Sequence, residues 1–171
     1  MNNDNTMFEK LTLNDKVFNV PDYPLPSLAE GQGEGLGRSV SFAVIHCSAT
    51  FPNQRVTIQD IDHWHRQRGF DGIGYHYYIT VDGLIWIGRP LSRIGAHCKG
   101  YNAHSIGICY EGGLDENGRP CDTRTLVQKA ALVALLNKLR ETFPKLTVVG
   151  HNALNPHKAC PCFNAAKEYN W

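Results

Sequence analysis

Two stretches of the chain repeat apolar residues at intervals of three and four, which predicts amphipathic helices. The first follows Thr57, whose hydroxyl stands three residues before Asp60 in a pattern close to a capping box, and it stops at Gly69. His63 and His65 lie two apart and point in different directions on such a helix, so we interpret them as surface or packing residues. The face that turns to the core consists of Ile58, Ile61, Trp64 and His65.

The second and longest helix is expected over residues 123–142, and Pro144 ends it. One face carries four leucines at positions i, i+3, i+4 and i+7, which is the spacing of a helix with one buried side. These residues are Leu132, Leu135, Leu136 and Leu139.

Five segments are typical of strands. Residues 40–47 form an apolar run that ends abruptly in a polar cluster, and residues 75–81 alternate before a hairpin turn at Asp82-Gly83. The others are 84–88, 105–111 and 146–149. Strands and helices interleave irregularly, so the sequence predicts an α/β domain with a central mixed β-sheet flanked by helices. Residues 93–102 lack periodicity and have the composition of a binding loop.

The N-terminal segment differs from the rest of the chain. Residues 1–38 contain three prolines between positions 21 and 26 and four glycines between positions 31 and 37. This composition is unsuited to a core and indicates an arm or linker. We therefore divide the chain into an N-terminal arm at 1–38 and a folded domain at 39–171.

Composition and charge exclude several classes of protein. The 171 residues are 42% apolar and 19% charged, which is ordinary for one globular domain. A formal net charge of +1 gives no global field that would recruit nucleic acid or an anionic membrane. No apolar run approaches the roughly 20 residues of a membrane-spanning helix, and the polar start lacks the apolar core of a signal peptide. We expect a monomer that stays in the cytoplasm as written, without a nucleic-acid partner or stable membrane insertion.

Six cysteines raise the question of disulfides. Cys47, Cys98 and Cys109 lie in or beside expected strands, and a bridge between Cys160 and Cys162 would be strained. Without a signal peptide, small buried thiols are the expected state, so we predict no structural disulfide.

Candidate chemistry is concentrated in residues 150–163, which hold two imidazoles, one ammonium and two thiols. Imidazole and thiolate are the ligands that zinc prefers, and a catalytic zinc usually has three protein ligands. His151 follows the strand expected at 146–149, and His46 ends the first expected strand, where α/β folds place their chemistry. The sequence therefore predicts one zinc held by His46, His151 and Cys160. His157, in the same loop, is an alternative to His151.

Further motifs accompany this site between Phe42 and Phe163: VIHCSAT at 44–50, WH at 64–65, GYH at 74–76, KGYN at 99–102 behind His97, SIG at 105–107 and KACP at 158–161. Each motif alone is weak. In this order they resemble the type 2 zinc-dependent N-acetylmuramoyl-L-alanine amidases and, more distantly, the peptidoglycan recognition proteins.

The resemblance implies a fold, a reaction and a set of site residues. The fold is a mixed sheet flanked by helices, with zinc on His46, His151 and Cys160 and with Tyr75 and Lys158 as catalytic partners. The substrate is the amide between the lactyl group of N-acetylmuramic acid and L-alanine in peptidoglycan. An endolysin-like protein of prophage origin, acting on the cell wall after release or export, is consistent with the missing signal peptide. The chain departs from the family pattern at Asn164, where an aspartate is frequent, and in a longer loop between the second and third ligands.

Other residues fit roles in such a site. Lys158, two residues before Cys160, is placed to present an ammonium to a developing oxyanion. The phenol of Tyr75 can donate or accept a hydrogen bond at the reacting water. His76 and His97 are candidates for orienting a ligand or lining the cleft, and an ordinary half-buried histidine is the alternative for each. Candidates for the substrate walls are Trp86, Tyr101 and Asn102.

Three other functions compete with a zinc amidase. The first is a non-catalytic module that binds peptidoglycan or muropeptides. The second is a thiol amidase in which Cys160 or Cys47 is the nucleophile and a histidine is the base. The third is a structural zinc protein in which His157 or Cys162 supplies a fourth ligand.

Overall fold

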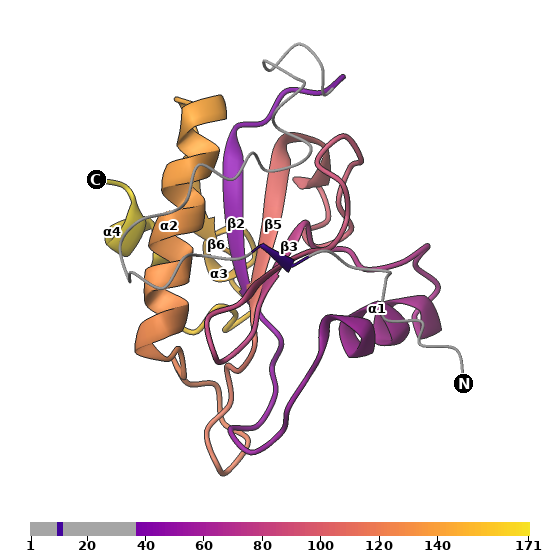
Figure 1. Ribbon diagram of the computed structural model, residues 1–171, viewed down its shortest axis with the longest axis vertical. Helices are drawn as coiled ribbons and strands as arrows, with labels where there is room; N and C mark the ends of the chain where they lie inside the picture. Colours follow the sequence, from indigo (N-terminus) through magenta and orange to yellow (C-terminus); the bar gives the residue numbers. More distant parts are fainter. Residues whose placement is uncertain (1–9, 12–36) are drawn as a thin grey trace.

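The computed structural model describes residues 10–11 and 37–171, and every structural statement below concerns these residues. A six-stranded sheet in the order β1-β4-β3-β5-β2-β6 forms its centre (Figure 1). β2 pairs in parallel with both β5 and β6, and β5 with β3, whereas β4 pairs antiparallel with β3 and β1. The strands are β1 (Lys10–Leu11), β2 (Phe42–Cys47), β3 (Tyr77–Ile79), β4 (Ile85–Ile87), β5 (Ser105–Tyr110) and β6 (Thr147–Gly150).

Helices cover both faces of this sheet, which confirms the predicted α/β class. Figure 1 shows α2 (Leu126–Thr142) and α1 (Ile58–Gln67) on opposite sides of the strands. The pleat of β3 separates the two packing layers, because Tyr77 joins the cluster that includes the α2 leucines and Tyr78 joins Ile58 and Ile61 of α1. The remaining helical elements are η1 (Asn102–His104), α3 (His151–Leu154) and α4 (Ala165–Tyr169).

The two long helices follow their sequence signals. Thr57 and Asp60 exchange both bonds of a capping box at the start of α1, and all four predicted leucines of α2 are buried. The start of α2 differs from the expectation, because the helix begins at Leu126 rather than at residue 123. Thr125 is its N-cap and forms a second capping box with Gln128.

Other expectations about the elements are corrected by the structure. The strand predicted over 75–81 is regular only at Tyr77–Ile79, although the amide of His76 still donates to the carbonyl of Gly107 at 2.8 Å. The helices α3 and α4 were not expected, because four and five residues are too few to show a helical period. Asn164 caps α4 by accepting from the amide of Lys167, a role for which aspartate and asparagine are equally suited.

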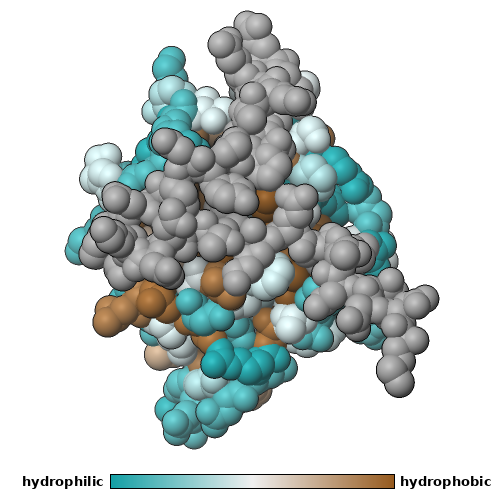
Figure 2. All heavy atoms as spheres, viewed as in Figure 1, coloured by the Kyte–Doolittle hydropathy of each residue, from teal (hydrophilic) through white to brown (hydrophobic). Residues whose placement is uncertain are grey.

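Most of the expected arm, residues 1–38, lies outside the described residues. Its described parts contact the domain: β1 pairs with β4 at the edge of the sheet, and the guanidinium of Arg38 donates to the carbonyls of Leu91 and Ser105, each at 3.0 Å. Figure 2 shows hydrophilic residues at the tip formed by the loops after β2 and β5, and apolar residues near the start of α2, where the exposed Leu126 lies. The described helices include none with the length and apolar character needed to span a membrane.

Candidate metal centre and cleft

His46 lies near the carboxyl end of β2, which is paired on both sides by β5 and β6. Ala43, Ile45 and Cys47 of this strand pack into the cluster on the α2 side, so the alternation of the strand turns His46 to the opposite face. Only 1% of its surface is exposed. Burial lowers the pKa of His46 well below its usual value, and His97 and His151 nearby lower it further. The imidazole is therefore neutral and keeps a lone pair for a ligand.

His151 comes from the neighbouring strand, because it is the first residue of α3 directly after β6. The turn between them is tight at Gly150, where an added Cβ would lie 2.7 Å from a ring carbon of Pro161. A side chain at position 150 would therefore displace the loop that follows Cys160. Burial, followed by the charge of Lys158, lowers the pKa of His151.

Cys160 belongs to the loop between α3 and α4, and hydrogen bonds fix that loop on both sides of it. The carbonyl of Cys160 accepts from the amide of Asn152 at 2.7 Å, and the carbonyl of Pro161 accepts from the buried hydroxyl of Tyr110 at 2.7 Å. The Cys160 sulfur accepts from the backbone N–H of Cys47 at 3.2 Å. That bond joins the loop to the end of β2, one residue after His46.

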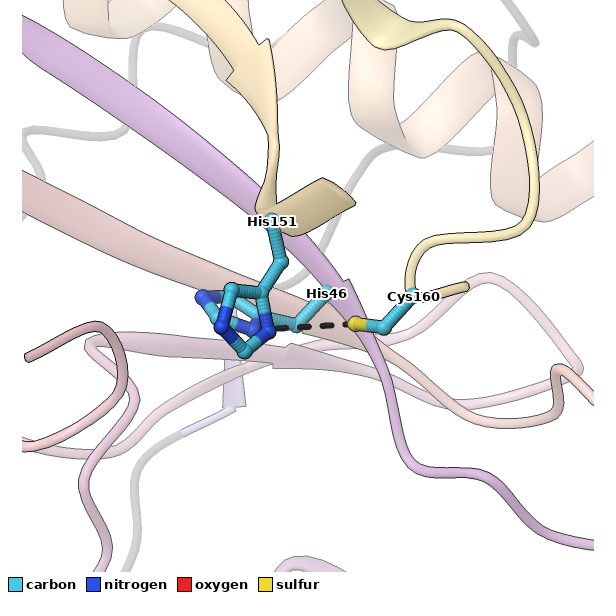
Figure 3. Close-up of side chains that lie close together, drawn as sticks. All are labelled: His46, His151 and Cys160. Carbon is cyan, nitrogen blue, oxygen red and sulfur yellow. Dashed lines mark hydrogen bonds between the residues drawn. The ribbon is translucent and has the colours of Figure 1, made fainter. Parts of the chain in front are cut away.

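One ligand atom from each of His46, His151 and Cys160 lies within 4.8 Å of the others (Figure 3). His46 directs Nδ1 toward the Cys160 sulfur, 3.7 Å away, and the two imidazole rings lie 4.6 Å apart between centroids. Two neutral imidazoles and a thiol in this arrangement fit the donor set of zinc. Within the described part of the chain, neither His157 nor Cys162 belongs to this group.

A chain of hydrogen bonds determines which nitrogen His46 offers. Its Nε2 lies 2.9 Å from Nδ1 of His97, and Nε2 of His97 lies 3.3 Å from the hydroxyl of Ser105. If Nδ1 of His46 is a ligand, its Nε2–H donates to His97, whose own Nε2–H donates to Ser105. His97 has little freedom to move, because a Cβ at Gly95 or at Gly107 would come within 2.5 Å of its ring.

His76 lies beside His97, is fully buried and does not line the cleft. Its Nδ1 accepts from the amide of Gly107 at 3.0 Å, so the proton sits on Nε2, which donates to the carbonyl of Arg93 at 3.0 Å. Burial, together with the smaller effect of the nearby Arg38 charge, lowers the pKa of His76 to about 4. A neutral His76 therefore supports the loop that carries His97.

His46, His151 and Cys160, together the metal group, open into a cleft of about 760 Å³. Its lining includes three cations, Arg68, Lys99 and Lys158, and no carboxylate from the described residues. Tyr75 lies in the wall with its ring 5.1 Å from that of His46, and burial, followed by nearby thiols, raises the pKa of its phenol well above 10. The phenol thus stays protonated near neutral pH and is a hydrogen-bond donor.

The candidates for the substrate walls fall into different places. Asn102 lines the cleft, and its side-chain oxygen accepts from the amides of His97 and Cys98 at 2.9 and 2.8 Å. Tyr101 is 37% exposed and packs edge-on against Phe42 outside the cleft lining. Trp86 lines a separate hollow beside α1.

Sequence reasoning missed several residues that shape the site. His65, interpreted as a surface or packing residue, is buried and also lines the cleft, with its Nδ1 accepting from the amide of Gly74 at 2.8 Å. Tyr110 and Arg124 hold the Cys160 loop, because Arg124 lies 3.3 Å above the ring of Phe163 and pairs with Glu168. Their partners are dozens of residues away in the sequence, and a local pattern carries no signal of such contacts.

Comparisons with known proteins agree with this geometry. Residues 36–163 match the family model described as N-acetylmuramoyl-L-alanine amidase. The endolysin of Enterobacteria phage K11 is 42% identical over 120 residues, which cover 70% of this chain and 79% of the phage protein. The endolysin of Escherichia phage T7 is 39% identical over 120 residues, which likewise cover 70% of this chain and 79% of the phage protein. Among solved structures, the endolysin amidase LysCS from Clostridium intestinale matches with a TM-score of 0.66 and 34% identity, covering 78% of this chain and 82% of the other.

Proposed function

We propose that this chain, which belongs to the N-acetylmuramoyl-L-alanine amidase family, binds one zinc through His46, His151 and Cys160 and uses it in catalysis. The chain hydrolyses the amide bond between N-acetylmuramic acid and L-alanine in peptidoglycan, as the endolysin and amidase relatives indicate. The observation that supports the zinc is the meeting of two imidazoles and one thiol within 4.8 Å at the base of the cleft.

Zinc bound there would polarise the scissile carbonyl and lower the pKa of a bound water to about 7. Residues of the chain itself orient and stabilise the proposed ligands. His97 fixes the orientation of His46 through the bond at 2.9 Å and so keeps Nδ1 directed toward Cys160. The N–H of Cys47 stabilises the negative charge of the Cys160 thiolate.

Two residues that line the cleft, Lys158 and Tyr75, are our candidates to act on the reacting amide. Lys158 lies in the cleft wall close enough to His151 for its charge to lower the pKa of that imidazole, so it can offer an ammonium to the oxyanion of the transition state. Tyr75 offers a protonated hydroxyl from the other wall, which suits a donor to the same oxyanion rather than a general base.

The charge of the cleft favours an anionic substrate. Arg68, Lys99 and Lys158 line it, and none of the described lining residues carries a carboxylate, so carboxylate-bearing stem peptides are attracted and held. Peptidoglycan peptides carry such groups. The cell wall is thus the place of action, and we propose that the protein reaches it after release or export and acts there as a monomer.

The decisive experiment measures zinc and products together. The purified protein should contain one zinc per chain and release stem peptides with a free L-alanine amine from muropeptides. Cys160→Ser should bind zinc more weakly and lose activity, whereas Cys121→Ser, an exposed thiol outside the metal group, should change neither. Full zinc content and full turnover in Cys160→Ser would show that the ligand assignment is wrong.

A chelator separates the zinc amidase from its competitors. Loss of activity with o-phenanthroline and recovery with added zinc is expected. Inactivation by a thiol-alkylating reagent that zinc does not prevent would instead favour a cysteine nucleophile. Binding to peptidoglycan without release of peptide, in zinc-loaded protein, would favour the non-catalytic binding module.

A further inference from the structure

A pair of thiols lies in the wall of the cleft beside the metal group. The sulfurs of Cys47 and Cys162 are 4.0 Å apart, although the two residues are separated by 115 positions in the chain. Both residues line the cleft and both are free thiols. Cys47 belongs to β2, and Cys162 belongs to the loop that carries Cys160.

The backbone around the pair brings the two sulfurs together. Cys162 has a φ of 71°, in the left-handed region that favours glycine, and its side chain points toward Cys47. Gly113 leaves the space that the thiols occupy, because an added Cβ there would lie 2.4 Å from the Cys47 sulfur. The Cys162 thiol donates to the carbonyl of Gly113 at 3.4 Å. The pair is thus surrounded by fixed backbone.

The neighbouring Cys160 has a different role. Its sulfur lies in the group with His46 and His151 and accepts the N–H of Cys47. A zinc ion on this group would keep the Cys160 thiolate coordinated and would leave Cys47 and Cys162 as the reactive pair. We propose that Cys47 and Cys162 are a modification site, at which oxidation forms an intramolecular disulfide while Cys160 remains a metal ligand.

The oxidation needs an electron acceptor, and a small-molecule disulfide such as oxidised glutathione supplies it. The Cys162 thiol gives up its proton to solvent and its sulfur attacks one sulfur of the reagent, which forms a mixed disulfide and releases one small thiol. Cys47 then attacks the Cys162 sulfur and releases the second small thiol. Two protein thiols lose two electrons and two protons, and one reagent disulfide becomes two thiols. The protein sulfurs, now 4.0 Å apart, must approach by about 2 Å to reach bonding distance, which requires a change in the side-chain torsion of Cys162.

The cross-link would join the two segments that carry His46 and Cys160. It would close a loop of more than 100 residues, which restricts the unfolded chain strongly and should raise the melting temperature by roughly 5–15 °C. The modification is a covalent change independent of substrate, so it can be detected whether or not the protein cleaves peptidoglycan.

The test oxidises the zinc-loaded full-length protein with excess oxidised glutathione and maps its peptides by mass spectrometry without reduction. We expect a linked peptide pair containing Cys47 and Cys162, two fewer free thiols per chain, unchanged zinc content and a higher melting temperature. Reduction with dithiothreitol should then remove the link, restore the two free thiols and lower the melting temperature to its starting value, while the zinc content stays constant.

Matched variants decide between pairings. Cys162→Ser should remove the linked peptide and the shift in melting temperature, whereas Cys121→Ser, in the exposed neighbouring loop, should retain both. Since Cys162 is only half-buried, its serine variant keeps the core intact. A stable glutathione adduct, a Cys121–Cys162 link, a link that includes Cys160 with loss of zinc, or no loss of thiols would each overturn the proposal.

Discussion

Neighbouring backbone groups hold two buried histidines near the cleft, His65 and His76, in one protonation state. The amides of Gly74 and Gly107 donate to Nδ1 of His65 and His76, which leaves the proton of each ring on Nε2. Hydrogen bonds to a neutral imidazole, together with burial, oppose its protonation. The metal group is therefore surrounded by neutral rings, and the positive charge of the cleft comes from its lysine and arginine side chains.

Lys158 provides the sharpest prediction for a single residue. Lys158→Ala should lower kcat by a factor on the order of 10²–10³ while zinc stays bound, because its ammonium meets negative charge only in the transition state. The measurement is kcat on soluble muropeptides beside zinc content. Lys145→Ala, another exposed lysine that does not line the cleft, is the control. An unchanged kcat would assign Lys158 to the solvated surface.

The sequence could predict the candidate ligands because few residue types bind zinc, because His46 and His151 stood at expected strand ends and because Cys160 lay in the loop that follows. The sequence could not predict side-chain contacts between residues that lie far apart along the chain. His65 has the helical spacing of a core residue, and nothing in that spacing shows that its ring also reaches the cleft. Trp86 and Tyr101 were proposed for their aromatic character alone, and their places depend on the packing of β4 and of the loop before η1.

At the scale of elements, the Cys160 loop is held by structure outside itself. Tyr110, at the end of β5, bonds to Pro161, and Arg124 lies against Phe163. The Arg124 guanidinium is almost fully buried and pairs with Asp122 and Glu168. The loop that carries the proposed metal ligand Cys160 therefore depends on β5, on α4 and on the segment before α2.

Arg124→Met should destabilise the protein by about 3 kcal/mol, because it leaves Asp122 and Glu168 without their cation. The partners are partly exposed, so we expect the lower end of the range for buried pairs. Urea unfolding measures the change, and Arg119→Met, at an exposed arginine of the preceding loop, should change stability little. A similar loss in both variants would contradict a special role for Arg124.

Long elements were predictable and short ones were not, for a physical reason. α1 and α2 span 10 and 17 residues, so their apolar faces repeat often enough to be recognised. α3 has four residues and forms because the chain turns after β6 against Pro161, a contact made by the fold. The hydrogen bonds at Tyr75 and His76 continue the sheet irregularly, which a pattern of alternation does not distinguish from a regular strand.

At the scale of the whole molecule, the buried histidines couple stability to pH. Burial, followed by the charge of Arg68, lowers the pKa of His65 to about 4, and burial lowers that of His76 to about 4. Both lie near 6.5 in an unfolded chain. Below that pH the unfolded state binds more protons, so the free energy of unfolding should fall between about pH 6.5 and pH 4, by about 3 kcal/mol for the fully buried His76 and by less for His65.

Urea unfolding of zinc-free protein across this range tests the coupling. His65→Gln removes one of the histidines with a lowered pKa, so its stability should fall less steeply with decreasing pH than that of the unmodified protein. His63→Gln is the matched control, because His63 lies two residues earlier on α1 with an exposed side chain, and its pH dependence should match the unmodified protein. Equal slopes in all three proteins would disprove the assignment to His65.

The boundary between arm and domain gives the last prediction. The family match begins at residue 36, whereas Arg38 donates to the carbonyls of Leu91, Ala103 and Ser105 and so joins β5 to η1 and to the loop after β4. Removal of residues 1–36 should retain zinc and activity with a modest loss of stability, since β1 is lost from the sheet edge. Removal of residues 1–38 should lower the melting temperature further, because three buried or half-buried carbonyls then lose a charged donor. Equal melting temperatures of the two truncated proteins would show that Arg38 contributes nothing and that the domain begins after it.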